Sequence, residues 1–384
     1  MFKQQGILPV WTYRNPVQVR FGSGIFSDLP TAIAGRRYAL ITYPDDYFRA
    51  LAADLGGKAG APALVIDDIA PNPDIRLLAE QIARFAALPD QPEVIVALGG
   101  GSVIDSAKVF AAARGDFAAM EAFLKKRAGA ETLRPLPLIA VPTTAGTGSE
   151  VTCWGTVWDA EGGNKFSLAH GGLYPEVSLV DPALMVGKPR GLTIQTGLDA
   201  LSHSLESLWN RSANPVSMAH AVAAARGVIA TLPRLVADLA NVDLRADMAR
   251  AATLAGFAFS NTKTAIAHSL SYPITLRHDV PHGIACSFSL PMIIRSVADQ
   301  GGICAEGIQA IFGATGNAAA AQLEEFLKKL GVSPNFHDYG VDDAEFRELV
   351  DLAIGGERGQ NFIGSKESLL AAAKLGADPR KAVA

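Results

Sequence analysis

Asp199 and His203 form the first pair in the chain whose residue types and spacing could bind a metal ion. They lie four positions apart in a segment without proline, so on a helix their side chains project from one face at neighbouring heights. One carboxylate oxygen and one imidazole nitrogen can then hold the same ion. The plainer alternative is a local ion pair between two residues one helical turn apart.

Two further histidines, His268 and His282, are fourteen positions apart. Pro273 and Pro281 lie between them and predict a break in the helix, because proline lacks a backbone N–H and clashes with the preceding turn. We therefore expect His268 on a helix and His282 at the start of the next one. One oxygen and three nitrogen donors suit a divalent transition metal better than calcium or magnesium. Against this, a lone helical histidine is more often a surface or core residue than a ligand.

A glycine-rich turn follows the apolar strand predicted at residues 93–98. Glycines let the backbone turn sharply and approach a ligand closely, while the helix predicted next directs free N–H groups at the same point. We expect Ser102 to cap this helix and Asp105 to complete a capping box. The alternative is a merely structural connection between strand and helix. The residues predicted to hold a pyrophosphate are Gly99, Gly100, Gly101 and Ser102.

A second loop, at residues 142–150, follows the strand predicted at 137–141 and is rich in hydroxyls and glycines. It can supply neutral donors to phosphate and ribose oxygens without burying charge. Two such loops, each at the end of a strand, are harder to explain as structural turns than one. The candidate cofactor residues here are Thr143, Thr144, Thr147 and Ser149.

The elements that must position these residues change character near residue 185. Before that point, short apolar strands separated by helical segments predict an α/β fold with a parallel sheet, in which ligands gather at the carboxyl ends of the strands. After it, the pattern is helical. The predicted strands are 16–21, 38–42, 63–66, 93–98, 137–141 and 175–182. The predicted helices include 75–87, 199–210, 215–230, 243–260, 264–272, 318–330 and 343–354.

The length of 384 residues favours two domains, because one hydrophobic core rarely serves so long a chain. We expect a dinucleotide-binding α/β domain at 1–185 and an all-helical domain at 186–384 that binds the metal and the substrate. A cleft between the domains would bring the phosphate loops and the metal ligands together, and such clefts commonly hold active sites.

Composition and charge argue against several classes of protein. Lys and Arg number 34 against 38 for Asp and Glu, which gives no electrostatic reason to expect nucleic acid or an anionic membrane as a partner. The three cysteines form no CxxC pair, which favours a reducing compartment and argues against a cysteine-built zinc site. No stretch has the pattern of a secretory signal or a membrane-spanning helix. We therefore expect a cytoplasmic enzyme.

Six segments, in the same order, resemble the iron-containing (group III) alcohol dehydrogenases, and the resemblance covers essentially the whole chain. It implies a Rossmann-like domain that binds NAD(H) or NADP(H), an all-helical domain, and a divalent metal between them. The metal is commonly Fe(II), with zinc or another divalent ion as the alternative. A homodimer is also implied. The six segments are 21–24 (Phe-Gly-Ser-Gly), 71–73 (Pro-Asn-Pro), 99–108 (Gly-Gly-Gly-Ser-Val-Ile-Asp-Ser-Ala-Lys), 142–150, 197–203 and 281–283 (Pro-His-Gly).

The resemblance also implies roles for individual residues. Residues 99–102 would hold the pyrophosphate, the hydroxyl residues of the second loop would lie near the cofactor, and Lys165 would lie by the nicotinamide ribose. The metal would polarise an aldehyde oxygen while the cofactor supplies the hydride. Asp105 and Tyr272 are the candidate catalytic side chains. The implied metal ligands are Asp199, His203, His268 and His282.

Two positions depart from the family's pattern. Many relatives carry a histidine ten residues before the one that matches His282, where this chain has Tyr272. Tyr272 either helps to relay a proton or only shapes the pocket, and a phenol with a pKa near ~10 is a poor base at neutral pH. Tyr43 stands where NAD-specific relatives often carry an acidic residue, so the sequence admits NADPH as well as NADH.

Lys263 and Arg277 place two cations close in sequence to the predicted metal ligands, although surface exposure is the plainer reading of each. The surrounding stretch is similar to the phosphonoacetaldehyde reductases, a branch of the same family that forms 2-hydroxyethylphosphonate in phosphonate biosynthesis. We therefore expect a small anionic aldehyde, its tail bound by Lys263 together with Asn164 or Arg277. The alternatives are a general short-chain alcohol dehydrogenase, a lyase resembling dehydroquinate synthase, and a metal-holding protein that is not an enzyme.

Overall fold

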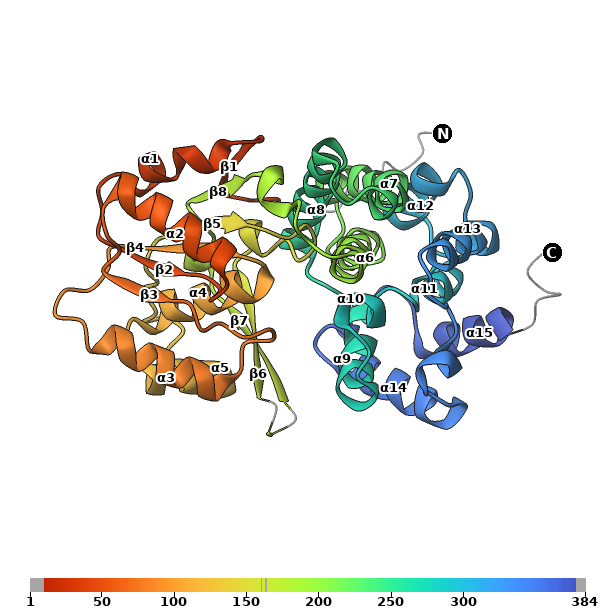
Figure 1. Ribbon diagram of the computed structural model, residues 1–384. Helices are drawn as coiled ribbons and strands as arrows, with labels where there is room; N and C mark the ends of the chain where they lie inside the picture. Colours follow the sequence, from red (N-terminus) through yellow and green to blue (C-terminus); the bar gives the residue numbers. More distant parts are fainter. Residues whose placement is uncertain (1–9, 160, 163, 378–384) are drawn as a thin grey trace, which may run out of the picture.

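The computed structural model describes residues 10–159, 161–162 and 164–377, which form two lobes lying side by side (Figure 1). The first lobe is built on a six-stranded sheet, in which all neighbouring strands are parallel and the order is β1-β8-β5-β4-β2-β3. The second lobe is helical. This confirms the predicted fold class. The six strands are β1 (Gln18–Phe21), β2 (Tyr38–Ile41), β3 (Leu64–Ile66), β4 (Val94–Gly99), β5 (Leu138–Pro142) and β8 (Val177–Val180).

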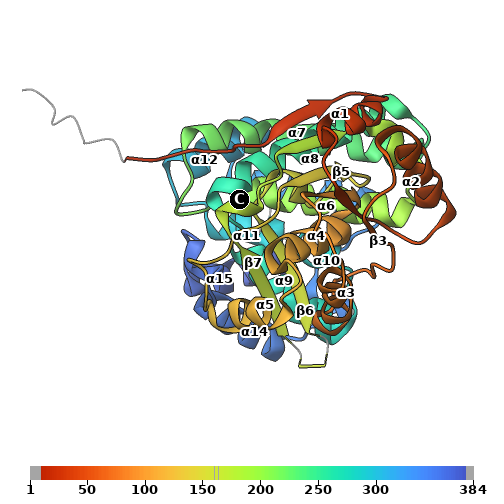
Figure 2. The ribbon, with the colours of Figure 1, turned by 90° about the vertical axis from the view of Figure 1, so that its left-hand side faces the viewer.

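Helices cover both faces of this sheet because its central strands are apolar on both sides. Ile82, Phe110 and Phe123 pack against one face, and Leu29 and Phe48 pack against the other. The hairpin of β6 (Trp154–Asp159) and β7 (Asn164–Ala169) is a separate antiparallel pair, and both views show it extending away from the sheet (Figure 2). The helices of this lobe are α1 (Leu29–Ile33), α2 (Asp46–Ala59), α3 (Ile75–Ala86), α4 (Gly101–Ala113) and α5 (Phe117–Lys126).

Strands β4 and β5 end side by side, with Gly99 paired in register with Pro142. Because the strands are parallel, the two loops that follow them start at the same edge of the sheet. This is the arrangement expected of two loops that share one ligand.

The capping box expected at the start of α4 is wrong. The residue before the helix is Gly100, in an extended conformation, and no side chain caps the helix. The Ser102 hydroxyl accepts a hydrogen bond from the Asn72 backbone N–H instead. The Asp105 carboxylate is directed to another loop, where it accepts a hydrogen bond from the Ser149 hydroxyl, so it does not cap the helix start.

The second lobe has one apolar core in which α6 is surrounded by its neighbours (Figure 1). Its helices are α6 (Arg190–Glu206), α7 (Pro215–Ala237), α8 (Val242–Thr262), α9 (Ile266–His278), α10 (His282–Ala285), α11 (Leu290–Ser296), α12 (Gly302–Phe312), α13 (Gly316–Lys329), α14 (Asp343–Gly355) and α15 (Lys366–Ala377). Short 3-10 turns connect several elements, and two of them, η2 (Ser149–Val151) and η6 (Gly359–Asn361), adjoin the site described below. The others are η1 (Ile25–Asp28), η3 (Gly171–Leu173), η4 (Pro182–Met185) and η5 (Phe336–Tyr339). Among the described helices, α7 is long and apolar enough to cross a membrane by length and composition, but Val228, Leu232 and Leu235 pack in this core.

Pro273 does not break the helix that carries His268, contrary to the prediction. Helix α9 runs through it to His278 and ends at Asp279, whose φ of 53° is left-handed. Pro281 then precedes α10, which begins at His282 as expected. The break that separates the two histidines therefore lies six residues later than Pro273 suggests.

Candidate active site

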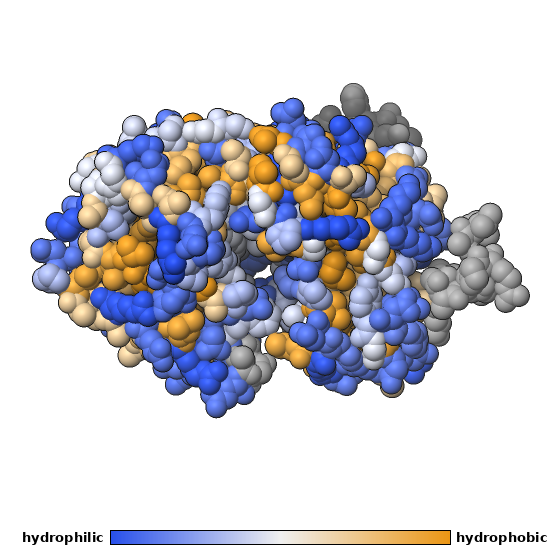
Figure 3. Space-filling model, viewed as in Figure 1, coloured by the Kyte–Doolittle hydropathy of each residue, from blue (hydrophilic) through white to orange (hydrophobic). Residues whose placement is uncertain are grey.

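A cavity of about 1150 Å³ lies between the two lobes and is lined by residues of both. Figure 3 shows the notch between the lobes on one face of the molecule. Gly99 and Arg277 are not among the lining residues, and the side chain of Asn164 lies outside the part that the structure describes. The other predicted site residues line this cavity: Tyr43, Gly100, Gly101, Ser102, Asp105, Thr143, Thr144, Thr147, Ser149, Lys165, Asp199, His203, Lys263, His268, Tyr272 and His282.

The two predicted phosphate loops touch each other directly. A Cβ at Gly101 would lie 2.6 Å from Thr147 Cγ2, and a Cβ at Gly100 would lie 3.2 Å from Thr144 Oγ1. The absence of side chains at these glycines therefore lets the first turn of α4 pack against the second loop. The Thr143 hydroxyl is buried without a hydrogen-bond partner among the described residues. A helix N-terminus with an unpartnered hydroxyl beside it fits the phosphates of a dinucleotide.

The two phosphate loops and the first turn of α4 together form what we call the cradle. A buried network behind the cradle fixes the second loop to α4. The Ser149 hydroxyl donates to Asp105 at 2.6 Å, and the Lys108 ammonium donates to the Ser149 carbonyl at 2.7 Å and to the Trp154 carbonyl at 2.6 Å. Burial lowers the pKa of Lys108 to about 8 and raises that of Asp105, against the effect of their mutual attraction. Asp105 thus holds Ser149 and the hairpin in position, which is a positioning role.

Tyr43 and Asp45 line the cavity on the side of the first lobe. The Tyr43 hydroxyl would be 3.6 Å from a Cβ at Gly100, and burial raises its pKa. Asp45 lines the same cavity two residues further on and caps α2 by accepting from the Phe48 N–H. The acidic group that the sequence analysis found missing at Tyr43 is therefore present nearby, on the residue that starts the next helix.

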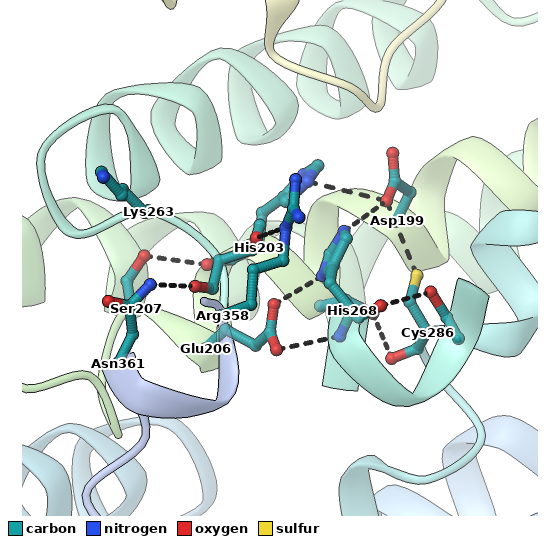
Figure 4. A network of polar contacts seen from close by, with 12 residues as sticks. Asp199, His203, Glu206, Ser207, Lys263, His268, Cys286, Arg358 and Asn361 are labelled. Carbon is teal, nitrogen blue, oxygen red and sulfur yellow. Dashed lines mark hydrogen bonds and ion pairs between the residues drawn. The ribbon is translucent and has the colours of Figure 1, made fainter. Parts of the chain in front are cut away.

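The candidate metal ligands converge from three helices. Asp199 Oδ1 is 3.7 Å from His203 Nε2 and 3.4 Å from His268 Nε2, and the rings of His268 and His282 have centroids 5.4 Å apart. Figure 4 shows Asp199, His203 and His268 pointing toward one another. Asp199, His268 and His282, with Cys286, have ligand atoms all within 4.8 Å of one another. His203 is not in that tightest group, although it stacks on His268 with centroids 4.6 Å apart.

Glu206 orients His268 and was missed in the sequence analysis. Its carboxylate is fully buried, lies 2.5 Å from His268 Nδ1, and accepts from the His268 backbone N–H at 3.1 Å. A proton on Nδ1 leaves the lone pair of His268 on Nε2, which has no hydrogen-bond partner among the described residues. A carboxylate that fixes the imidazole tautomer in this way is typical of a metal-binding histidine. Glu206 is the last residue of α6, the helix that also carries Asp199. A charged residue on the buried face of this helix was the signal by which the sequence could have revealed Glu206.

The charges of the cluster also suit a cation. Burial alone would raise the pKa of Asp199, but the nearby imidazoles, His203 first, lower it below its ordinary value. Burial lowers the pKa of His203 to about 4 and, with the Lys165 cation, lowers that of His282 as well. Burial likewise acts to lower the pKa of His268, but Glu206 outweighs it and the net pKa is raised. An ionised carboxylate among imidazoles, two of them neutral, is a fitting donor set for a divalent transition metal.

The Cys286 thiol belongs to this cluster, a role that was not predicted from the sequence. Its Sγ is 3.6 Å from Asp199 Oδ1, and burial raises the pKa of the thiol well above its ordinary value. The signal was its position four residues after His282, one helical turn on, where Cys286 caps the C-terminal end of the short helix α10.

Tyr272 is close both to the metal cluster and to two cations. Its ring stacks on His282 with centroids 5.7 Å apart, the Lys165 ammonium is 3.4 Å from its centroid, and the Arg358 guanidinium carbon is 4.9 Å from it. Burial raises the pKa of Tyr272 to about 12, and burial and Arg358 lower that of Lys165. A phenol so hard to ionise is a poor base, which favours the pocket-shaping alternative for Tyr272.

The structure revises the candidates for the substrate tail. Arg277 forms ion pairs with Glu345 and Glu348 on the surface, with 42% of its side chain exposed, so we remove it from the site. Lys263 lines the cavity, but 57% of its side chain is exposed and its ammonium lies 3.7 Å from Glu357. Arg358 lines the cavity as well and was missed, because it lies 76 residues after His282, the last of the candidate metal ligands, in a turn without a recognisable pattern.

Fold and cavity together define a metal-dependent, nicotinamide-linked oxidoreductase. The chain belongs to the iron-containing alcohol dehydrogenase family: residues 16–182 match the iron-containing alcohol dehydrogenase domain and residues 193–367 match the C-terminal domain of the same family. It is thus an NAD(P)-dependent enzyme that interconverts aldehydes and alcohols. This assignment replaces the lyase and the non-enzymatic alternatives.

Similar proteins within the family differ in the substrates that their names give. The chain is 34% identical to 1,3-propanediol dehydrogenase of Klebsiella pneumoniae over 77% of this chain and 78% of the other. It is 31% identical to phosphonoacetaldehyde reductase of Streptomyces viridochromogenes over 76% and 77%. The structure of sulfoacetaldehyde reductase from Bifidobacterium kashiwanohense in complex with NAD⁺ superimposes with a TM-score of 0.86 at 28% identity, covering 97% of this chain and 100% of that one.

Proposed function

We propose that this enzyme reduces a small aldehyde with an anionic tail to the primary alcohol, and that phosphonoacetaldehyde, which gives 2-hydroxyethylphosphonate, is the best candidate substrate. The observation that carries the proposal is the pair of cations, Lys165 and Arg358, beside Tyr272 in the cavity that also contains the candidate metal ligands. A phosphonate or sulfonate would be attracted to such a pocket and could form charge-assisted hydrogen bonds there.

Two similar proteins support an anionic tail. Phosphonoacetaldehyde reductase and sulfoacetaldehyde reductase are named for aldehydes that both carry a charged group one methylene from the carbonyl carbon. The similarity to 1,3-propanediol dehydrogenase favours a second candidate, a neutral short-chain aldehyde. The two candidates differ in whether the cationic pocket contributes to binding.

The proposed reaction divides its tasks between the lobes. The loops at Gly100 and Thr144 would hold the dinucleotide, and Asp199, His203, His268 and His282 would hold a divalent metal. A metal bound there supplies Lewis acidity that stabilises the charge developing on the aldehyde oxygen during hydride transfer. Glu206 keeps His268 in the tautomer that presents Nε2 to the cluster. Neutral Tyr272 lines the pocket, with the His282 imidazole stacked on its ring and the Arg358 guanidinium close to the same ring.

A substrate panel tests the proposal. The holoenzyme would be assayed with phosphonoacetaldehyde, sulfoacetaldehyde and propanal, each with NADH and NADPH, by following oxidation of the cofactor. Charged hydrogen bonds of about 1.5–3 kcal/mol predict a kcat/KM about 10- to 100-fold higher for an anionic aldehyde than for propanal. An equal or higher kcat/KM for propanal would overturn the proposal in favour of the short-chain alcohol dehydrogenase.

A further inference from the structure

Arg358 lies in a turn whose backbone leaves little freedom. It sits between α14 and η6, next to Gly359, where a Cβ would come within 1.9 Å of the Ala353 carbonyl oxygen. From the same turn, Asn361 donates its side-chain N–H to the Thr264 carbonyl at 2.8 Å, which ties η6 to the segment between α8 and α9. Figure 4 shows Arg358 and Asn361 together beside the histidine cluster. The turn thus delivers an arginine to the cavity from a fixed position.

The guanidinium of Arg358 is oriented but not neutralised. Its Nε donates to Thr264 Oγ1 at 3.0 Å, and its Cζ lies 4.9 Å from the centre of the Tyr272 ring. Among the residues that the structure describes, no carboxylate forms an ion pair with it. No residue in the described part of the chain accepts a hydrogen bond from Nη1 or Nη2, so their N–H groups are available to a ligand. Arginine presents these groups as a planar fork that matches two oxygens of a phosphonate, sulfonate or carboxylate.

The other cations near the site are less suited than Arg358 to bind an anionic tail. Lys263 is mostly exposed and is paired with Glu357. Arg277 is held by two surface carboxylates outside the cavity. Lys165 shares the Tyr272 ring with Arg358, and the repulsion between the two cations contributes to the lowered pKa of Lys165. An anion between them would relieve this repulsion, so the pocket beside Tyr272 suits a negative group better than a neutral one.

We infer that Arg358 is the specificity-determining residue that binds the anionic tail of the substrate through Nη1 and Nη2, with Tyr272 and Thr264 holding its guanidinium in place. The inference rests on the proposed function and names the group responsible for it. His282 and Arg358 contact Tyr272 as neighbours of a single ring. A tail bound by Arg358 would therefore lie close to the candidate metal ligand His282, which favours a short aldehyde.

The test compares Arg358→Leu, Arg358→Lys and Lys263→Ala in the metal-loaded enzyme. Lys263→Ala is the matched control, since it removes a cation that lines the same cavity but is paired and exposed. Steady-state kinetics with phosphonoacetaldehyde, sulfoacetaldehyde and propanal would be combined with KM for NADH and with thermal melting. For Arg358→Leu we expect KM for both anionic aldehydes to rise about 10- to 100-fold, with propanal and NADH changed less than about threefold. Arg358→Lys should recover part of the loss, and Lys263→Ala should change each value less than about threefold.

Other outcomes overturn the inference in distinguishable ways. Equal losses for propanal and the anionic aldehydes, or a large fall in melting temperature, would mean that Arg358 only supports the fold. A rise in KM for NADH alone would mean that it binds a cofactor phosphate. A larger effect of Lys263→Ala would move the role to Lys263. If wild type prefers propanal, the proposed function itself fails; if wild type prefers an anionic aldehyde and Arg358→Leu leaves that preference intact, only the role of Arg358 fails.

Discussion

The two walls of the cavity differ in the chemical groups that form them. The part of the first lobe's wall that the two phosphate loops form consists of backbone turns and neutral hydroxyls at Gly100, Gly101, Thr144 and Thr147, with the charges of the Lys108 network buried behind it. The same lobe also contributes charged residues to the cavity, Lys165 among them, but away from these loops' glycines and hydroxyls. The wall from the second lobe consists of charged or ionisable side chains. The partners there are distant in sequence: 62 residues separate Glu206 from His268, and 87 separate Asp199 from Cys286.

This difference determines which substitutions should impair each wall. The first wall depends on close packing, so it should be sensitive to added volume and indifferent to the metal. The second depends on charge and on the direction of lone pairs, so it should respond to isosteric changes that leave the packing intact. Four predictions test this contrast.

The largest effect is expected for His268→Ala, which removes an imidazole from the metal cluster. The contribution of Lewis-acid stabilisation, several kcal/mol, corresponds to a loss of about 10³-fold in the rate of aldehyde reduction. Metal content by elemental analysis should fall, while NADH binding followed by fluorescence should stay unchanged because the cradle is on the other lobe. A variant that keeps its metal, or that loses NADH binding as well, would break the proposed division between the walls.

Glu206→Gln tests the same wall without changing its volume. The amide is a weaker acceptor for His268 Nδ1–H and the backbone N–H, so we expect metal affinity to fall about 10- to 100-fold. Metal competition with a chromophoric chelator would measure this. Glu150→Gln is the matched control, a buried glutamate of the first lobe whose replacement should leave metal affinity unchanged. Similar affinities in the two variants would count against the assigned role of Glu206.

Gly101→Ala tests the packing of the first wall. The new methyl would meet Thr147 at 2.6 Å, so we expect a higher KM for NADH and a loss of about 1–3 kcal/mol in the free energy of unfolding. Gly57→Ala is the control, because Gly57 is exposed within α2 and a Cβ there meets nothing within 4 Å. It should raise the free energy of unfolding by about 0.5–1 kcal/mol and leave KM alone. Urea denaturation and cofactor titration would measure the stability and the NADH affinity of both variants. If Gly101→Ala changed neither quantity, the tight contact between the loops would be contradicted.

The smallest effect concerns the charge buried behind the cradle. The pKa of Lys108 is about 8 in the folded protein against an ordinary value of 10.5, so between these values the unfolded chain binds more protons. The free energy of unfolding then gains a contribution that rises with pH, by at most about 1.4 kcal/mol per pH unit for one proton. Lys108→Met should lack this contribution. Urea denaturation of both proteins from pH 7.5 to 9.5 would measure it, and identical pH dependences would contradict the burial of the cation.

The sequence predicted the first wall well because its information is local. The strand, the glycines and the helix of residues 94–113 are contiguous, and so are β5 and the hydroxyl loop after it. Hydrophobic runs and glycine positions determine such units without reference to the rest of the chain. The errors were also local: the expected capping box at Ser102 and Asp105 ignored the pull of the buried Ser149 network, and the packing around α9 tolerated Pro273.

The second wall was predicted only in part. The spacing of Asp199 and His203 and the motif around His282 were visible in the chain, and with His268 they supplied the candidate ligands. Glu206 and Cys286 carried only weak signals, a charge on the buried face of a helix and a position four residues after His282, and Arg358 carried none. The role of each of these residues depends on a neighbour that is distant in sequence. Only the packing of the helices therefore shows that role.

By itself the sequence determined the order and type of the elements, the two phosphate loops and the residue types able to bind a metal, because hydrophobic periodicity and turn chemistry act over a few residues. The tertiary structure decided which carboxylate orients His268, which thiol joins the cluster and which arginine faces the cavity unpaired. Those choices depend on the distances between helices, which are set by packing across the whole lobe rather than by any short stretch of chain.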